Sequence, residues 1–140
     1  MKRYLAMVLV LILALCIGVV AVAEENDTRA SDYFSGYGIT LSKPGSARIN
    51  ITFSCSAVGT ASQIGVSTYA VQRYDEDNGS WTAVTGWLNG SYSYNASSHS
   101  FAKTFQGVNG EKYRVKCTFL CVKDGTAESK SYTSRTITLP

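Results

Sequence analysis

Of the four cysteines, Cys16 lies within the apolar run at the start of the chain, and the other three most directly indicate chemistry: Cys55, Cys117 and Cys121. Cys117 and Cys121 are four residues apart, about 13 Å along a single strand, so they cannot bond to each other without breaking that strand. Cys55 is therefore the shared partner of one predicted disulfide. Aligning the strand starts at 47 and 113 places Cys55 opposite Cys121, which makes Cys121 the preferred partner and Cys117 the alternative. The other interpretation is that all three thiols are small buried apolar groups.

Catalysis and metal binding have little support in the sequence. His99 is the only histidine, and it lies in a polar, serine-rich stretch that we expect to be a loop. One histidine and three scattered cysteines do not make a closed zinc site. The acidic residues at 75–77 precede Asn78-Gly79 and predict a hairpin tip, because the later bidentate glutamate of a calcium loop is missing. No G-x-S-x-G motif or glycine-rich phosphate loop is present. The sequence therefore predicts no catalytic residue, no metal and no cofactor.

Aromatic side chains are the best indication of binding. Tyr92 and Tyr94 share one face of a predicted strand beside Trp87, where they could stack on sugar rings or anchor a protein. A second aromatic group lies at 33–37. The alternative is that tyrosines fill half-buried strand positions, as they commonly do in β-rich domains. We take Trp87, Tyr92 and Tyr94 as the candidate binding residues, with an extracellular protein or glycan as the partner.

The elements that would position these residues are short strands. Apolar and polar residues alternate strictly from 47 to 57 and again from 113 to 119, which is typical of half-buried strands. Four dipeptides predict tight turns: Asn78-Gly79, Asn89-Gly90, Asn109-Gly110 and Asp124-Gly125. Further strands are expected at 37–41, 64–74, 80–86, 91–94, 100–105 and 129–139. Seven or eight antiparallel strands without a helical period predict an all-β, two-sheet sandwich, with a small closed barrel as the main rival.

The first part of the chain indicates export. Residues 1–23 carry two basic residues, then an uncharged apolar run that ends in Ala21-Val22-Ala23, and this pattern predicts a helical, cleaved signal peptide. An uncleaved anchor is the alternative. We expect a flexible polar leader at 24–32 and a single domain at 33–140.

Charge narrows the list of partners. The chain has 13 Lys and Arg against 10 Asp and Glu, and loss of Lys2 and Arg3 leaves 11 basic residues. A mature chain so nearly neutral lacks the clustered basic face that nucleic-acid binding requires. With no apolar segment at its end, it is also expected to have no contact with the membrane after cleavage.

Two resemblances add to this interpretation. Residues 69–81 and 105–115 resemble strands of fibronectin type III domains, members of the immunoglobulin-like class of sandwiches, and the resemblance implies that Tyr113 is the tyrosine of their tyrosine corner. The stretches 29–34, 63–65, 79–81 and 110–113 are similar to a family of small secreted proteins of Gram-positive bacteria whose function is uncharacterised, and the similarity covers most of residues 29–138. That resemblance implies an exported single-domain protein and brings no activity or cofactor.

The expected function is that of a secreted, non-enzymatic interaction module. It would be a monomer, or a weak or thiol-linked dimer. The alternatives are a self-associating structural or matrix component and a small secreted effector that acts on other cells.

Overall fold

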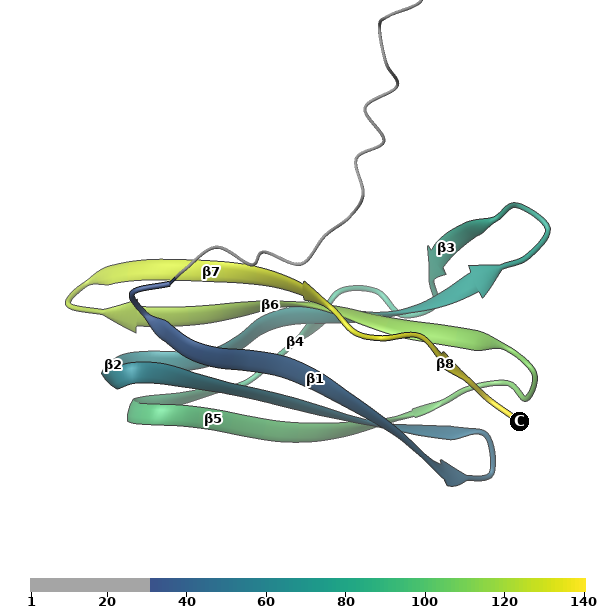
Figure 1. Ribbon diagram of the computed structural model, residues 1–140, viewed down its shortest axis with the longest axis horizontal. Coiled ribbons are helices and arrows are strands. Elements are labelled where there is room, and N and C mark those ends of the chain that lie inside the picture. Colours follow the sequence, from purple (N-terminus) through teal and green to yellow (C-terminus); the bar gives the residue numbers. More distant parts are fainter. Residues whose placement is uncertain (1–30) are drawn as a thin grey trace, which may run out of the picture.

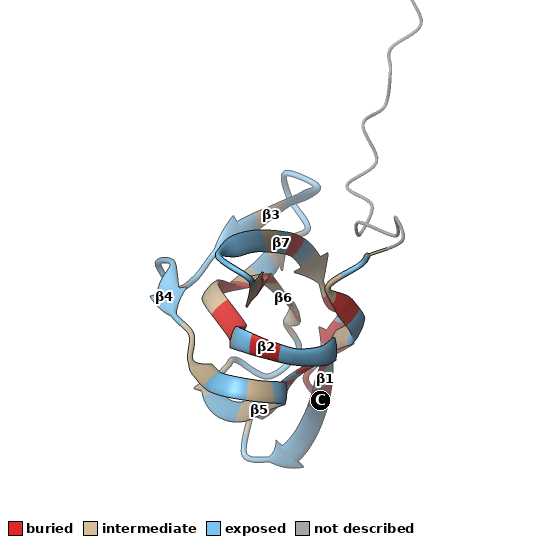
Figure 2. Ribbon diagram, turned by 90° about the vertical axis from the view of Figure 1, so that its left-hand side faces the viewer, coloured by how far each residue is buried: buried red, intermediate tan, exposed pale blue. Residues whose placement is uncertain are grey.

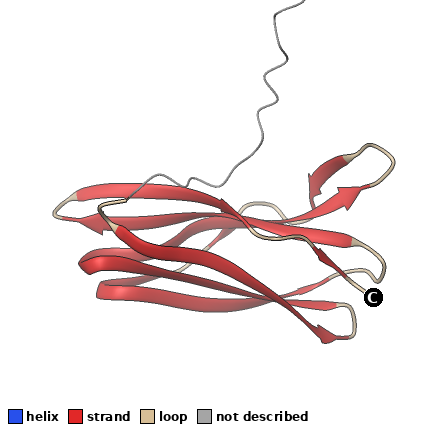
Figure 3. Cartoon of the chain, in the orientation of Figure 1, coloured by secondary structure: helices blue, strands red, loops and turns tan. Residues whose placement is uncertain are grey.

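The computed structural model describes residues 31–140, which form strands and turns without a helix (Figure 3). The all-β prediction is confirmed. The predicted signal peptide at 1–23 and residues 24–30 of the predicted leader lie outside the described residues. Within the described part, no helix is long and apolar enough to span a membrane. The eight strands are β1 Phe34–Gly45, β2 Arg48–Asp75, β3 Ser80–Ala83, β4 Leu88–Asn89, β5 Tyr92–Gln106, β6 Lys112–Lys123, β7 Thr126–Thr133 and β8 Ile137–Thr138.

Strand β2 is long and doubles back on itself (Figure 1). Its first half, up to Ser56, pairs with β1 on one edge and with β5 on the other. Its second half, from Ala61, pairs with β6 on one edge and with β3, β4 and the start of β5 on the other. The sequence predicted two separate strands here. They are continuous because the backbone stays extended through the bend except at Gly59, where φ is 74°.

All strand pairs are antiparallel, and the hydrogen bonds connect the eight strands into one sheet that contains the path β1-β2-β6-β7. The sheet curls so that buried residues lie on its inside (Figure 2). The hydrogen bonding does not divide the strands into two sheets, because β2 and β5 run through both halves of the curl. The strand count agrees with the predicted seven or eight.

The core lies between the two halves of the curled sheet. The alternation predicted from the sequence is confirmed in both strands, since every inward residue of the two patterns is buried except Ala47, which stands in the preceding turn. Across the core, the ring of Tyr37 in β1 lies 5.4 Å from that of Phe119 in β6. The inward residues are Ile49, Ile51, Phe53, Cys55 and Ala57 of β2, and Tyr113, Val115, Cys117, Phe119 and Cys121 of β6.

Three of the four turn predictions are correct. Positive φ values occur at Gly79, at Gly110 and at the Asp124-Gly125 pair. The prediction for Asn89-Gly90 is wrong, because Asn89 lies in β4 and pairs with Thr68 of β2. A Cβ atom added at Gly90 would lie 2.1 Å from the carbonyl oxygen of Val66. Glycine is needed there for close approach of two backbones rather than for a turn.

Tyr113 anchors the loop between β5 and β6. Its hydroxyl accepts a hydrogen bond of 2.9 Å from the backbone N–H of Val108, five residues upstream. Its ring lies 5.5 Å from that of Phe105 at the end of β5. This bond fixes the path of the chain as it crosses from one half of the curl to the other.

Candidate functional site

One edge of the sheet carries an unusual run of sequence, which we call the uncharged edge segment: residues Ser80–Ser98. It contains no Asp, Glu, Lys or Arg, although the chain has 23 such residues. Among residues 31–140, the strands of this segment pair only with β2, which leaves their outer edge open. Natural edge strands are commonly protected by lysine, proline or a covering element. An edge with no charge and no proline is a surface suited to a partner.

The uncharged edge segment also concentrates exposed apolar side chains. Trp87 is 63% exposed and Tyr94 is 65% exposed, and Val84 and Leu88 are exposed as well. Only two other large apolar residues of the described chain, Val58 and Val108, are comparably exposed. Figure 2 shows β4 as exposed and the chain between β4 and β5 as partly buried. Single exposed apolar residues are ordinary, but four within eleven positions indicate an interaction surface.

Tyr92 and Tyr94 share one face, as the sequence predicted. Tyr92 pairs with Gly65 and Tyr94 with Gln63, on either side of the fully buried Ile64, so both rings stand on the outer face of the sheet. Tyr92 is half-buried, and burial, followed by the neighbouring Tyr94, raises the pKa of its hydroxyl. Tyr94 is therefore the more accessible of the two rings.

Trp87 is not immediately beside the tyrosines. The next residue, Leu88, pairs with Tyr69, whereas Tyr94 pairs with Gln63. Six residues of β2 separate these two register positions, which corresponds to about 20 Å. The three candidate binding residues thus lie along one edge as an extended row rather than in one compact patch.

Thr85 positions Trp87, and the sequence analysis missed it. The N–H of Val84 donates to the carbonyl of Val71 at 2.9 Å, and the N–H of Val71 then donates to the hydroxyl of Thr85, also at 2.9 Å. The hydroxyl of Thr85 thus takes the place of a backbone carbonyl in the hydrogen bonding between this segment and β2. Residues 86–87 then leave the sheet, and pairing with β2 resumes at Leu88. Nothing in the local pattern distinguishes this threonine from its neighbours.

Gly65 and Gly90 allow the backbone of the segment to lie in close contact with the backbone of β2. A Cβ atom at Gly65 would lie 2.1 Å from the carbonyl oxygen of Ser91 and 2.8 Å from the Cα of Tyr92. Gly90 approaches Val66 equally closely. The backbone at 90–92 therefore lies directly on β2, and this contact holds the tyrosine pair in place.

The three cysteines of the described chain are free thiols, and all are buried. Burial, and after it the neighbouring Cys121, raises the pKa of Cys55 to about 12. Burial and then Cys55 raise the pKa of Cys117. The structure contains no bond between the three thiols, so the Cys55–Cys121 pairing, with Cys117 as alternative, stays a prediction.

His99 lies in β5, so its predicted place in a loop is wrong. Its Nε2 atom is 2.7 Å from the hydroxyl of Ser91 and its Nδ1 atom is 2.8 Å from the hydroxyl of Ser93. Burial lowers the pKa of the imidazole. Strand β5 bends at Asn95, where φ is 49°. The hydrogen bonds of His99 connect the part of β5 after this bend to the chain before it, at Ser91 and Ser93. Both partners are hydroxyls, so no carboxylate orients the ring.

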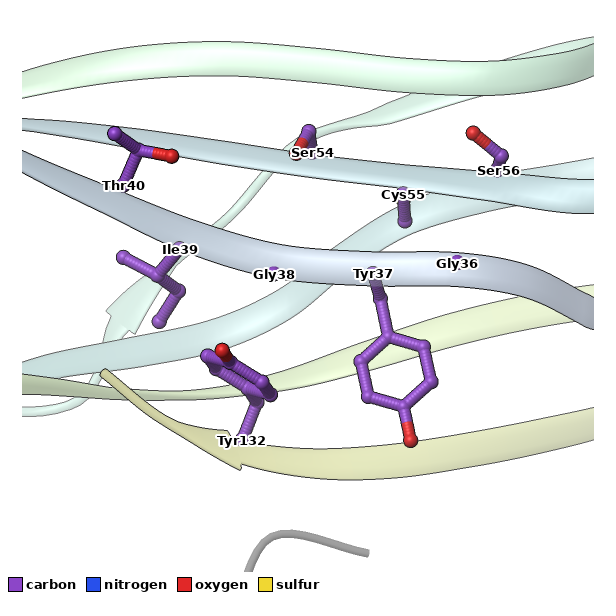
Figure 4. A pocket seen from close by; sticks show the side chains of 9 residues that line it. All are labelled: Gly36, Tyr37, Gly38, Ile39, Thr40, Ser54, Cys55, Ser56 and Tyr132. Carbon is purple, nitrogen blue, oxygen red and sulfur yellow. The ribbon is translucent and has the colours of Figure 1, made fainter. Parts of the chain in front are cut away.

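Two hollows occur elsewhere on the described surface. One, of about 450 Å³, lies beside β1, where the side chains of Tyr37 and Tyr132 lie on one side of the strand and Thr40, Ser54 and Ser56 on the other (Figure 4). The second, of about 500 Å³, lies between residues 73–77, at the end of β2 and the turn after it, and residues 110–111, in the loop before β6. Neither hollow is lined by a residue of the uncharged edge segment.

The acidic hairpin tip is a turn, as predicted. The carboxylate of Asp75 accepts hydrogen bonds from the backbone N–H groups of Asp77 and Asn78. The side chain of Asn78 also donates to this carboxylate and is the largest cause of its lowered pKa. In residues 31–140, no group of three or more His, Cys, Asp or Glu side chains is arranged to hold a metal ion.

An ion pair within β7 is hydrogen-bonded to the residues that precede β1. Lys130 is 4% exposed, and its Nζ lies 3.1 Å from a carboxylate oxygen of Glu128. The hydroxyl of Ser31 donates to the other oxygen of Glu128 and accepts from the N–H groups of Tyr33 and Phe34. The bond from Ser31 thus holds the residues before β1 against β7, outside the uncharged edge segment.

No family model matches the sequence, and no curated protein or solved structure matches it either. The functional conclusion therefore rests on the geometry of the chain itself.

Proposed function

We propose that this chain is a secreted, non-enzymatic binding module that holds an extracellular partner on the uncharged edge segment. The observation that carries the proposal is the row of exposed aromatic residues, Trp87 and Tyr94 with the half-buried Tyr92, on an edge that has no charge. Aromatic side chains supply large contact areas at low entropic cost, and Ser, Gly and Asn between them supply adaptable hydrogen bonds. Export is supported by the pattern of residues 1–23.

We further propose that the curled sheet is a sandwich of the fibronectin type III kind. One half combines β1, the first part of β2 and β5, and the other combines β7, β6, the second part of β2 and β3. The bond from Val108 to the Tyr113 hydroxyl has the form of a tyrosine corner, in which the hydroxyl binds backbone a few residues upstream. Such a scaffold presents edges and loops as binding surfaces while its core stays fixed.

The alternative of a thiol-linked dimer is less favoured by the positions of the cysteines. Cys55, Cys117 and Cys121 are 3%, 2% and 0% exposed. A thiol inside the curled sheet reaches a second molecule only after local opening, which costs a large share of the stability of a small domain.

The test is retention of the purified secreted protein on cell walls and polysaccharide. Replacing Trp87, Tyr92 and Tyr94 together by Ala is expected to abolish retention and leave the circular dichroism spectrum unchanged. The control is a Val58→Ala and Val108→Ala double variant, which removes exposed apolar side chains outside the segment. Retention that survives the triple substitution would show that the partner binds elsewhere.

A further inference from the structure

We infer that the partner of the uncharged edge segment is a neutral glycan chain. The inference rests on the proposed function and adds the chemistry of the partner. It follows from the charge of the segment, the spacing of its exposed rings and the polar groups beside each ring.

The charge of the segment argues against ionic partners. Recognition of phosphate or carboxylate groups depends on Lys and Arg, which form strong charge-assisted hydrogen bonds and release counterions. Residues Ser80–Ser98 contain neither, and they contain no Asp or Glu to bind a basic peptide. The guanidinium of Arg114 lies over the ring of Trp81, 4.3 Å from its centroid, but the stretch from Leu88 to Tyr94 pairs with the uncharged residues 63–69 of β2. A charged polymer bound along that stretch would lose hydration without gaining an opposite charge. A partner without charge is the one that fits.

The spacing of the rings favours a polymer of similar units over a folded protein. The anchors of protein interfaces cluster near the centre of one dry, well-packed patch. Here Trp87 and Tyr94, 63% and 65% exposed, stand at positions that are about 20 Å apart along β2. A chain of linked rings can contact both at once, with polar residues between them.

Each exposed ring is accompanied by an exposed asparagine. Asn89 follows Trp87 by two residues and pairs with Thr68, and Asn95 follows Tyr94 directly at the bend of β5. A sugar ring has an apolar face of C–H groups and a rim of hydroxyls. An aromatic ring covers such a face, and an amide both donates to and accepts from the rim. The segment therefore presents an aromatic ring and an amide at two places, suited to two positions along one glycan.

The deciding experiment measures retention of the full secreted chain on cell-wall material after two separate treatments. Periodate cleaves sugars that have vicinal diols, and glycan hydrolases added after it degrade the sugars that lack them, whereas protease removes proteins. Retention that is lost after periodate with glycan hydrolases and kept after protease is the expected result. Retention that survives periodate with glycan hydrolases, or that is lost after protease, overturns the inference. In either of those cases the proposed function stands if the triple Ala variant is still not retained, and falls if that variant binds normally.

A second measurement tests the neutral character directly. Migration through native gels that contain a soluble neutral polysaccharide, hydroxyethyl cellulose or a β-glucan, is compared with migration through gels that contain an acidic one, polygalacturonate. Binding to the neutral polymers is expected to be insensitive to salt, because no ion pairs form. Retardation only in the acidic gel, removed by salt, would overturn the inference.

Single variants then separate stacking from folding. Trp87→Ala and Tyr94→Ala are each expected to weaken retention about tenfold, and Tyr94→Phe, which keeps the ring, is expected to bind nearly as the parent does. Asn89→Ala and Asn95→Gly remove the amides and should also weaken retention. If Tyr94→Ala and Tyr94→Phe bind alike, the ring is not a contact of the glycan and the inference is wrong.

Discussion

Phe53 and Tyr69 belong to the same strand, and yet the centroids of their rings lie 4.9 Å apart. Sixteen residues separate them, which would be about 53 Å in a straight strand. The contact shows that β2 folds back so that its two halves face each other across the core. One strand therefore aligns β1, β5, β6 and the uncharged edge segment, and the position of the candidate binding residues depends on the shape of β2.

Removal of the Tyr113 hydroxyl should destabilise the domain slightly. Tyr113→Phe deletes the acceptor of the Val108 N–H and leaves the buried ring in place. Val108 is 54% exposed, so water can reach this part of the loop. We expect a loss of about 1 kcal/mol in the free energy of unfolding, measured with urea. Tyr94→Phe, at an exposed ring, is the control, and equal stability of the two variants would contradict a stabilising role for this bond.

Gly65 and Gly90 should not tolerate a side chain. Gly65→Ala and Gly90→Ala each place a Cβ atom 2.1 Å from a backbone oxygen, so β2 and the edge segment must separate. We expect each to cost about 1–3 kcal/mol in urea unfolding and to weaken retention on cell walls. At Gly36 nothing lies within 4 Å of an added Cβ. Gly36→Ala should therefore change stability by no more than about 0.5 kcal/mol, and a similar loss in all three variants would show that close approach is not the cause.

His99 should make stability depend on pH below neutrality. Burial holds the pKa of its imidazole below the ordinary 6.5 in the folded chain. The unfolded chain then binds the proton more readily, so this contribution to stability is complete above pH 6.5 and declines as the pH falls below it. Urea unfolding at a series of pH values between about 8 and 5 measures the effect. His99→Gln should have a flatter profile over this range, and a profile identical to the parent would exclude His99 as the source.

The thiols should form one bridge in the secreted protein. Intact mass with and without reduction, after alkylation in denaturant, is expected to show one disulfide and one free thiol, and peptide mapping should join Cys55 to Cys121 or to Cys117. In the reduced protein, native alkylation should be slow, because Cys55 is buried and its pKa is raised to about 12. Three free thiols would show that the cysteines serve only as core residues. A dimer that is lost on reduction would favour self-association instead.

The sequence by itself determined what kind of elements the chain forms and, for the strands around 47–57 and 113–121, which residues line the core. Alternation with a period of two specifies an inward and an outward face, and burial of one face makes that assignment strict. The turns at 78–79, 109–110 and 124–125 could also be predicted, because only residues that tolerate positive φ fit there. The shared face of Tyr92 and Tyr94 follows from the same period.

Only the tertiary structure decided how these elements join. The continuous path of β2, the role of Gly90 in a close contact and the place of His99 in β5 depend on neighbours far away in the sequence, which local patterns do not encode. The same holds for the hydrogen bond that the Thr85 hydroxyl accepts from β2 and for the distance between Trp87 and the tyrosines. A strand pattern states which face is buried, but the register and curvature that give each face its neighbours are set when the whole sheet packs.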